Sequence, residues 1–176
     1  MQGAPAGWDA RSATAVSADG SVIAGGLTSD DPDLVTAIRL YRWTEQTGIV
    51  DLGVPDGCTA FVADTMTPDG RTILGWGGDA TGRVYAMIWR QGIGFINLRE
   101  LLMANGVDMT NWTLDFTHSL SDDGLTISGD ATYHPPENPA NYIGYGFWVT
   151  IPTPGTTVVL VLGAAPLLHR NRRVAR

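Results

Sequence analysis

The sequence predicts an all-β protein built from repeated four-stranded antiparallel units of about 50 residues, propeller-like and incomplete, with one short helix inserted. Three segments of ten residues, at 16–25, 66–75 and 120–129, align without gaps on one pattern: apolar, Ser/Thr, any, Asp, Gly, any, any, Ile, any, Gly. An aromatic and apolar run that ends in tryptophan follows each segment. The chain also has 22 glycines and 10 prolines among 176 residues, which is turn-rich but below the level of low-complexity chains.

The Asp-Gly pair inside each segment predicts a β-hairpin turn. Such a turn needs positive φ, which glycine adopts without a steric penalty, and residues that favour strands lie on both sides. We expect a structural role for these turn positions, which are Asp19, Gly20, Asp69, Gly70, Asp123 and Gly124.

Each unit is predicted to contain four short strands, and the first unit sets the pattern. Its strands are expected at 13–17, 21–25, 37–43 and 49–52, with counterparts in the second unit. The third unit has no apolar stretch directly after its tryptophan that corresponds to 49–52, so it is expected to lack the last strand.

The recurring apolar positions predict how the units pack. The isoleucines Ile23, Ile73 and Ile127 are expected to fill the same core site in each unit. The tryptophans are expected to pack between neighbouring sheets, and they are Trp43, Trp89 and Trp148. The closing glycines are expected to mark a bulge or a close backbone approach where the strand ends, and they are Gly25, Gly75 and Gly129.

Residues 97–106 depart from the repeat and predict the one helix. Asn97 is a suitable N-cap with Glu100 three residues later, and Asn105 is followed by a glycine that provides a stop. The side chains expected to face the sheet are Leu98, Leu101, Leu102 and Met103, and those expected in solvent are Arg99 and Asn105.

The three repeats, each a hairpin followed by a strand that ends in tryptophan, resemble the units of the HAF-type extracellular repeat proteins. In that family each unit joins an Ala-x-x-x-Ser-x-Asp-Gly-x-x-Ile-x-Gly hairpin to an Ala-x-x-Trp strand. The resemblance covers about residues 8–149 and is carried by 13–25, 38–43 with 48–53, 64–75 with 86–89, and 105–112 with 119–129. It implies a secreted or surface protein of bacteria, in a family with no agreed enzymatic activity.

The same hairpin is similar to the Asp-box turn of sialidases and other glycan-active propellers, which has the form Ser-x-Asp-x-Gly-x-Thr-Trp. In this chain the Asp and Gly are adjacent and the terminal Trp is missing, so a structural turn is expected. A glycan-binding or glycan-active propeller fragment remains the alternative function. Four aromatic residues near loops are candidates for stacking on sugars or for packing in the sheets, and they are Trp8, Trp76, Tyr133 and Tyr142.

The chain changes character after the repeat domain, which spans residues 1–150 with units at about 8–57, 58–112 and 113–150. Residues 151–176 combine a Pro-x-Pro start, an apolar run and an arginine cluster. This order resembles the PEP-CTERM sorting signal, which an exosortase recognises and removes. The residues that carry the resemblance are Pro152, Thr153, Pro154, Arg170, Arg172 and Arg173.

This sorting signal departs from its family in two ways, and other interpretations of the segment stay open. Thr153 stands where the family has Glu, and Pro166 breaks a short apolar run. The alternatives are a last buried strand at 157–162 with a solvated basic tail, or a tail anchor.

The first eight residues have neither a basic nor an apolar region, so they do not form a secretion signal. Three units are too few to close a propeller, which has typically four to eight blades. Both observations favour a start upstream of Met1 or a gene remnant, and a closed assembly of several chains is the competing explanation.

Charge and composition exclude several function classes. The net charge is −7, all 11 basic residues are arginine, and four of them lie in the last seven residues. An acidic repeat domain repels phosphate backbones, so nucleic acid is not an expected partner. Without lysine the chain has no lysine-containing phosphate loop.

The residues that could carry chemistry are scattered. His118, His134 and His169 lack metal-ligand spacing, and Cys58 has no His beside it in sequence. The acidic clusters at 29–33 and 121–123 lack the spacing of a calcium loop, and the sequence gives no geometry for a glycosidase pair.

Together these features predict an exported interaction module of the cell surface or extracellular matrix, without catalytic activity, cofactor or metal. Its expected partners are an exosortase-type processing enzyme, the membrane through the unprocessed C-terminal segment, and extracellular polysaccharide.

Overall fold

The computed structural model describes residues 3–31, 33, 37–138, 141–151 and 159–163. They form three four-stranded antiparallel units, of which the repeats predict the first two in full. The first unit contains β2 (Ala15–Val16), β3 (Val22–Ser29), β4 (Ile38–Thr44) and β5 (Gly48–Gly53), and the second contains β6 (Ala60–Met66), β7 (Thr72–Gly78), β8 (Val84–Arg90) and β9 (Gly94–Asn97). The third contains β10 (Trp112–Leu120), β11 (Thr126–Tyr133), β12 (Ile143–Thr150) and β13 (Val159–Gly163).

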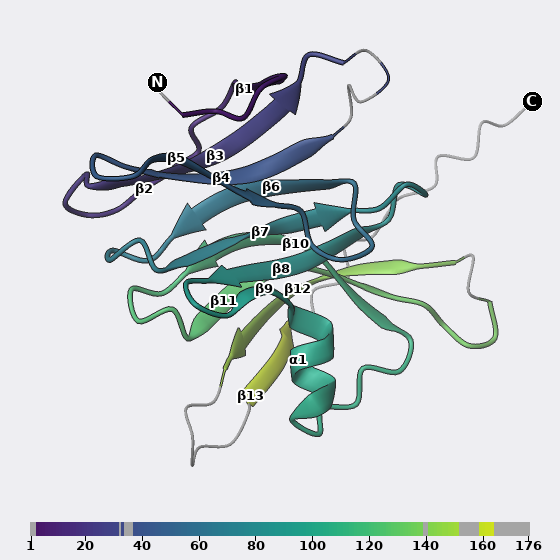
Figure 1. Ribbon diagram of the computed structural model, residues 1–176. Coiled ribbons are helices and arrows are strands. Elements are labelled where there is room, and N and C mark those ends of the chain that lie inside the picture. The colour runs from purple at the N-terminus through teal and green to yellow at the C-terminus, as the bar shows by residue number, and fades with distance from the viewer. Residues whose placement is uncertain (1–2, 32, 34–36, 139–140, 152–158, 164–176) are drawn as a thin grey trace, which may run out of the picture.

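The units stack face against face in chain order, and the first and last sheets lie at opposite ends of the stack (Figure 1). One parallel residue pair, Ile38 with Ala60, joins the first two units into a single nine-stranded sheet. The fold is therefore all-β and propeller-like, and its sheets do not close into a ring.

Two strands differ from the sequence prediction. An additional strand, β1 (Trp8–Ala10), pairs with the far end of β3, so the innermost strand of the first unit is split into two pieces. In the third unit β13 pairs antiparallel with β12 from Gly146 to Thr150, so the expected lack of a fourth strand is wrong. β13 follows β12 after a longer connection than the ones that precede β5 and β9. Strand pairing depends on register and not on the distance in sequence between the two strands, so the expectation failed.

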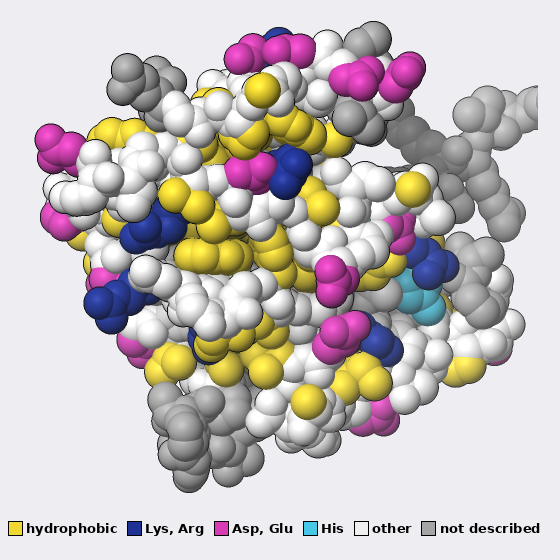
Figure 2. Space-filling view, viewed as in Figure 1, with side chains coloured by type: hydrophobic (Ala, Val, Ile, Leu, Met, Phe, Trp, Pro, Cys, Tyr) yellow, Lys and Arg dark blue, Asp and Glu magenta, His cyan; other side chains and the backbone are white. Residues whose placement is uncertain are grey.

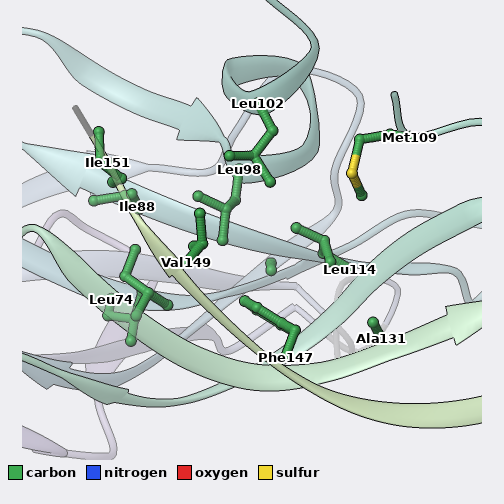
Figure 3. Close-up of a cluster of buried hydrophobic side chains, with 12 residues drawn as sticks. Leu74, Ile88, Leu98, Leu102, Met109, Leu114, Ala131, Phe147, Val149 and Ile151 are labelled. Atoms are coloured by element: carbon green, nitrogen blue, oxygen red, sulfur yellow. The ribbon is translucent and has the colours of Figure 1, made fainter. Parts of the chain in front are cut away.

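The core lies between the sheets. One cluster joins Val22, Ala24 and Leu40 of the first unit to Phe61 and Ile73 of the second. A larger cluster joins the second and third units and is drawn in Figure 3, where Leu74 and Ile88 lie opposite Phe147 and Val149. Burial of these side chains between sheets is the main force that holds the units together.

The recurring isoleucines occupy equivalent positions with different surroundings. Ile73 and Ile127 are fully buried, each in the cluster shared with the preceding unit. Ile23 is only half-buried, because it lies on the outer face of the first unit beside Leu27 and Tyr41. The same repeat position is thus buried in the second and third units and partly exposed in the first unit, which lies at one end of the stack.

The tryptophans were expected to pack between neighbouring sheets, and only Trp89 does so. Trp43 is half-buried on the outer face of the first unit, and Trp148 is 45% exposed. Trp148 is shifted in register: Val149 pairs with Ile127 at the position where tryptophan pairs with isoleucine in the other units. A shift of one residue turns a strand side chain to the opposite face.

The closing glycines allow a close backbone approach, as predicted. A Cβ at Gly25, Gly75 or Gly129 would lie 1.9–2.1 Å from a backbone carbonyl oxygen. That oxygen belongs to Ser12 between β1 and β2 in the first unit, to Val62 of β6 in the second and to Phe116 of β10 in the third. The ladder also bulges beside Gly75 and Gly129. The strands do not end at these glycines, which is a correction, because β3, β7 and β11 continue three to four residues beyond them.

The helix α1 (Leu98–Ala104) begins and ends as predicted, with Asn97 as the N-cap accepting from Glu100 N and Asn105 as the C-cap. Leu98 and Leu102 are buried in the core, and Leu101 packs against it (Figure 3). Two side chains were placed wrongly. Met103 is 48% exposed, and Arg99 is half-buried because its guanidinium donates to the carbonyls of Met109 and Trp112.

Candidate functional site

Antiparallel strands place successive connections at alternate ends of each sheet. The hairpins with the Asp-Gly turns therefore share one end, which we call the turn edge and which lies at the left of Figure 1. The opposite end, which we call the loop edge, carries the longer connections at 54–59, 79–83, 98–111 and 134–138.

The predicted turn residues form one hydrogen-bonded arrangement, repeated in all three units. In the first unit, Asp19 accepts from the hydroxyl of Ser17 at 2.7 Å and from the backbone N–H of Ser21 at 3.0 Å. Ser17 Oγ in turn accepts from the N–H of Val22 at 2.9 Å. Thr67 and Ser121 repeat these bonds in the other units, and Gly20, Gly70 and Gly124 have φ of 73°, 65° and 71°.

These hydrogen bonds to the charged carboxylate lower the pKa of the turn aspartates. The pKa of Asp19 is lowered to about 2, first by the backbone N–H of Ser21. The pKa values of Asp69 and Asp123 are lowered chiefly by the hydroxyls of Thr67 and Ser121. All three are satisfied within their own turns, so they serve as structural residues.

The turn edge also connects one unit to the next. Arg42 Nε donates to the carbonyl of Gly70 at 3.2 Å, and Arg90 Nη2 donates to the carbonyl of Gly124 at 3.1 Å. Each arginine belongs to the unit before the turn that it contacts. The sequence analysis missed these contacts, because the two arginines occupy different positions relative to the tryptophan of their strand.

A second inter-unit contact joins the innermost strands β6 and β10. Thr117 Oγ1 donates to Asp64 Oδ2 at 2.6 Å, and His118 Nε2 lies 3.0 Å from Asp130 Oδ2 nearby. Burial raises the pKa of Asp64, against the opposing effects of Thr117 and His118. Asp64 and His118 lie at the bulges beside Gly75 and Gly129, and that spacing is the signal in sequence that could have located them.

The loop edge is hollowed around the turn at 79–83. A hollow of about 620 Å³ lies between the second and third units, and two further hollows of about 300 and 450 Å³ adjoin it. All three share Arg83 in their walls. The residues that line the largest of them include Arg83, Tyr85, Asp115, Phe116, Thr132 and Tyr142.

Hydrogen bonds fix the central turn of this edge. Asp79 accepts from the N–H and hydroxyl of Thr81, the N–H of Arg83 and the phenol of Tyr85, at 2.6–3.1 Å. These bonds, with the hydroxyl of Thr81 first, lower the pKa of Asp79 to about 2, and the bond to Asp79 raises the pKa of Tyr85. The turn therefore fixes the backbone of Arg83 and the phenol of Tyr85 at the rim of the hollows.

The aromatic candidates from the sequence divide into two groups. Trp76 and Tyr142 line hollows of the loop edge, and Trp76 stacks edge-on against Phe116 with ring centroids 5.4 Å apart. Trp8 packs under Arg39, and Tyr133 packs against Trp112 at 4.9 Å. Trp76 and Tyr142 are therefore the two candidates that lie in the walls of the hollows described above.

Cys58 lies in another hollow of about 580 Å³, lined also by Val54–Gly57 and Phe95. Burial, with the charge of Asp79, raises the pKa of its thiol, which favours the unreactive form. Among the described residues no group of three or more His, Cys, Asp or Glu side chains could hold a metal ion. Of the acidic residues at 29–33 that the structure describes, Asp31 accepts a local turn bond from the N–H of Asp33, and Asp30 forms an ion pair with Arg11 at 3.5 Å.

The residues of the sorting signal, Pro152, Thr153, Pro154, Arg170, Arg172 and Arg173, lie outside the described part of the chain. Of the apolar run that separates them, Val159–Gly163 is strand β13 on the third sheet. The one described helix, α1, is too short and too polar to span a membrane.

No protein-family model and no curated protein matches the chain. Among solved structures it is similar to TolB from Acinetobacter baumannii, with a TM-score of 0.47 and 15% identity over 86% of this chain and 32% of that chain. It is also similar to a protein named as TolB from Agrobacterium tumefaciens, with a TM-score of 0.47 and 16% identity over 91% of this chain and 50% of that one. The chain thus spans between a third and a half of these two proteins.

Proposed function

We propose that this chain is a non-catalytic interaction module of an exported protein, held at the cell surface or in the extracellular matrix, and that it contacts its partner through the loop edge. The observation that supports the contact surface is the difference between the two edges. The turn edge repeats one self-satisfied turn, whereas the loop edge carries unlike loops around three adjoining hollows. Binding residues commonly lie on loops that a rigid scaffold positions.

Export is supported by the two resemblances in the sequence. The repeats resemble a family of extracellular proteins, and Pro152 to Arg173 follow the order of a sorting signal that a processing enzyme removes. Under this proposal an exosortase-type enzyme and the membrane are transient partners of the C-terminal segment. Cleavage near Thr153 would also remove β13, because that strand lies after the cleavage point.

Localisation and C-terminal mass test this proposal together. An antibody raised against the chain should label the protein on intact cells, which avoids amine-directed reagents because the chain has no lysine. Mass spectrometry of the labelled product should show a C-terminus near residues 152–156. An unlabelled protein that keeps residues 157–176 inside the cell would contradict export. Replacing Arg170, Arg172 and Arg173 with Ala gives the matched control, because it should prevent processing while leaving the described sheets unchanged.

A further inference from the structure

The largest hollow of the loop edge has exposed aromatic faces in its wall. Tyr142 is 69% exposed and Phe116 is 38% exposed, although large apolar side chains are normally buried. Phe116 is held by its edge-on contact with Trp76 from the neighbouring unit. The ring is therefore positioned before any ligand arrives, which reduces the entropy cost of binding.

A hydrogen-bond donor and a hydrogen-bond acceptor, both charged, also line this hollow. Arg83 is exposed at the rim and presents a planar set of N–H donors. Asp115 is half-buried in the wall, where the hydroxyl of Thr132 donates to its carboxylate and fixes its orientation. The hollow thus offers a charged donor, a charged acceptor and aromatic faces within about 620 Å³, which is the size of small-ligand sites.

The main chain of the hollow is paired on one side. Val84 is opposite Gly78 in one ladder, and Thr132 is opposite Thr113 in another. β10 is an edge strand of its sheet, so what favours recognition by side chains is the aromatic and charged chemistry of the wall. The chain's net charge of −7 disfavours a nucleic acid.

From this arrangement we propose that the hollow binds pyranose rings of a polysaccharide, with Tyr142 and Phe116 as stacking surfaces and with Arg83 and Asp115 as hydrogen-bonding partners of the hydroxyl groups. A pyranose presents an apolar C–H face and a rim of hydroxyls that both donate and accept, which matches these side chains. Asp115 is the one carboxylate among the described lining residues, whereas glycoside hydrolysis uses a pair. The proposal is therefore binding without cleavage, and it rests on the loop edge being the contact surface.

Affinity electrophoresis of the purified chain tests the proposal, with β-glucan and xylan as neutral probes and alginate as a uronic-acid probe. At least one neutral polysaccharide should retard the protein. Tyr142→Ala and Arg83→Ala should each weaken that binding about tenfold, since one stacking contact or charged hydrogen bond corresponds to about one such factor. Tyr142→Phe keeps the ring and should bind as the unchanged protein does.

Two substitutions serve as matched controls outside the hollow. Trp148→Ala removes an aromatic ring that is 45% exposed on β12, and Arg71→Ala removes an exposed arginine of the turn edge. Both should change binding less than about twofold. Thermal unfolding of each variant checks that the sheets are intact.

Three results would overturn the proposal: no polysaccharide retards the protein, Trp148→Ala weakens binding as much as Tyr142→Ala, or alginate alone binds and is released at high salt. If the protein reaches the cell surface but binds none of the polysaccharides, this inference is wrong and the proposed function is unaffected. If the protein stays inside the cell but binds β-glucan through Tyr142, the proposed export is wrong and this inference is supported.

Discussion

The turn edge and the loop edge of the stacked sheets differ in how closely the three units repeat one another. At the turn edge the same hydrogen-bonded Asp-Gly turn occurs three times, and two of the turns receive an arginine from the preceding unit. At the loop edge each connection has its own length and composition, and the hollows lie there. Repetition thus provides a scaffold at one edge, and variation provides the surface that we propose for binding at the other. This contrast predicts that substitutions at the turn edge affect stability and that those at the loop edge affect binding.

The largest effect is expected for Gly70→Ala. Gly70 has φ of 65°, and a Cβ there would lie 2.7 Å from Val22 Cβ of the preceding unit. Backbone strain and overpacking together should lower the free energy of unfolding by about 2–4 kcal/mol. Gly20→Ala is the matched control, because Gly20 has φ of 73° but nothing within 4 Å of its Cβ position, and it should cost about 1–2 kcal/mol. Equal losses in urea unfolding would show that the turn makes no contact between units.

A smaller loss is expected for Arg90→Ala. The guanidinium donates to the carbonyl of Gly124 across the junction between the second and third units, so its removal should cost about 1–2 kcal/mol. Arg71→Ala removes an arginine whose side chain is 74% exposed and should cost less than about 0.5 kcal/mol. If both variants unfold at the same urea concentration, the bond from Arg90 to Gly124 does not stabilise the junction between the units.

Acid should weaken the turn edge. The pKa of Asp19 is about 2 in the folded chain against 3.8 ordinarily, so its contribution to stability is present above pH 3.8 and is lost as the pH falls towards 2. Asp69 and Asp123 shift in the same direction. Asp19→Asn should therefore flatten the decline of the unfolding midpoint across this range, measured by circular dichroism.

Asp64 should have the opposite influence on the pH profile. Its folded pKa is raised by burial, so protonation at low pH favours the folded state through this group. Asp64→Asn removes that contribution and should make the decline of the unfolding midpoint with acid steeper. A decline that is flattened instead would show that Asp64 is not held in a buried environment.

The smallest effect on stability is expected at the loop edge itself. Tyr142→Ala removes a side chain that is 69% exposed, so the free energy of unfolding should change by less than about 0.5 kcal/mol. If chemical unfolding shows a loss comparable to that of Gly70→Ala, the loop edge contributes to the scaffold and the two edges are not distinct.

Sequence reasoning located the parts of the fold that depend on local chemistry. The Asp-Gly turns, the helix caps at Asn97 and Asn105, and the close approach at Gly75 and Gly129 follow from residue type and short spacing. It placed Trp148 wrongly, because one residue of register in a strand decides the face and the repeat alone does not fix it.

The candidate site was far less predictable. Of its side chains, the sequence pointed to Trp76 and Tyr142, since exposed aromatics near loops are candidates for ligand contact. Arg83, Asp115 and Phe116 carry no motif, and they come together only because two sheets meet there.

By itself the sequence determined the repeat, the four-stranded unit and the turns, because these features depend on backbone preferences and on contacts within about ten residues. The tertiary structure decided which unit faces which. It buried Ile73 and Ile127 but left Ile23 at an end of the stack, and it supplied β13 from beyond the repeat. The hollow between the second and third units belongs to that second category, because its walls come from strands far apart in the chain and exist only when the sheets pack together.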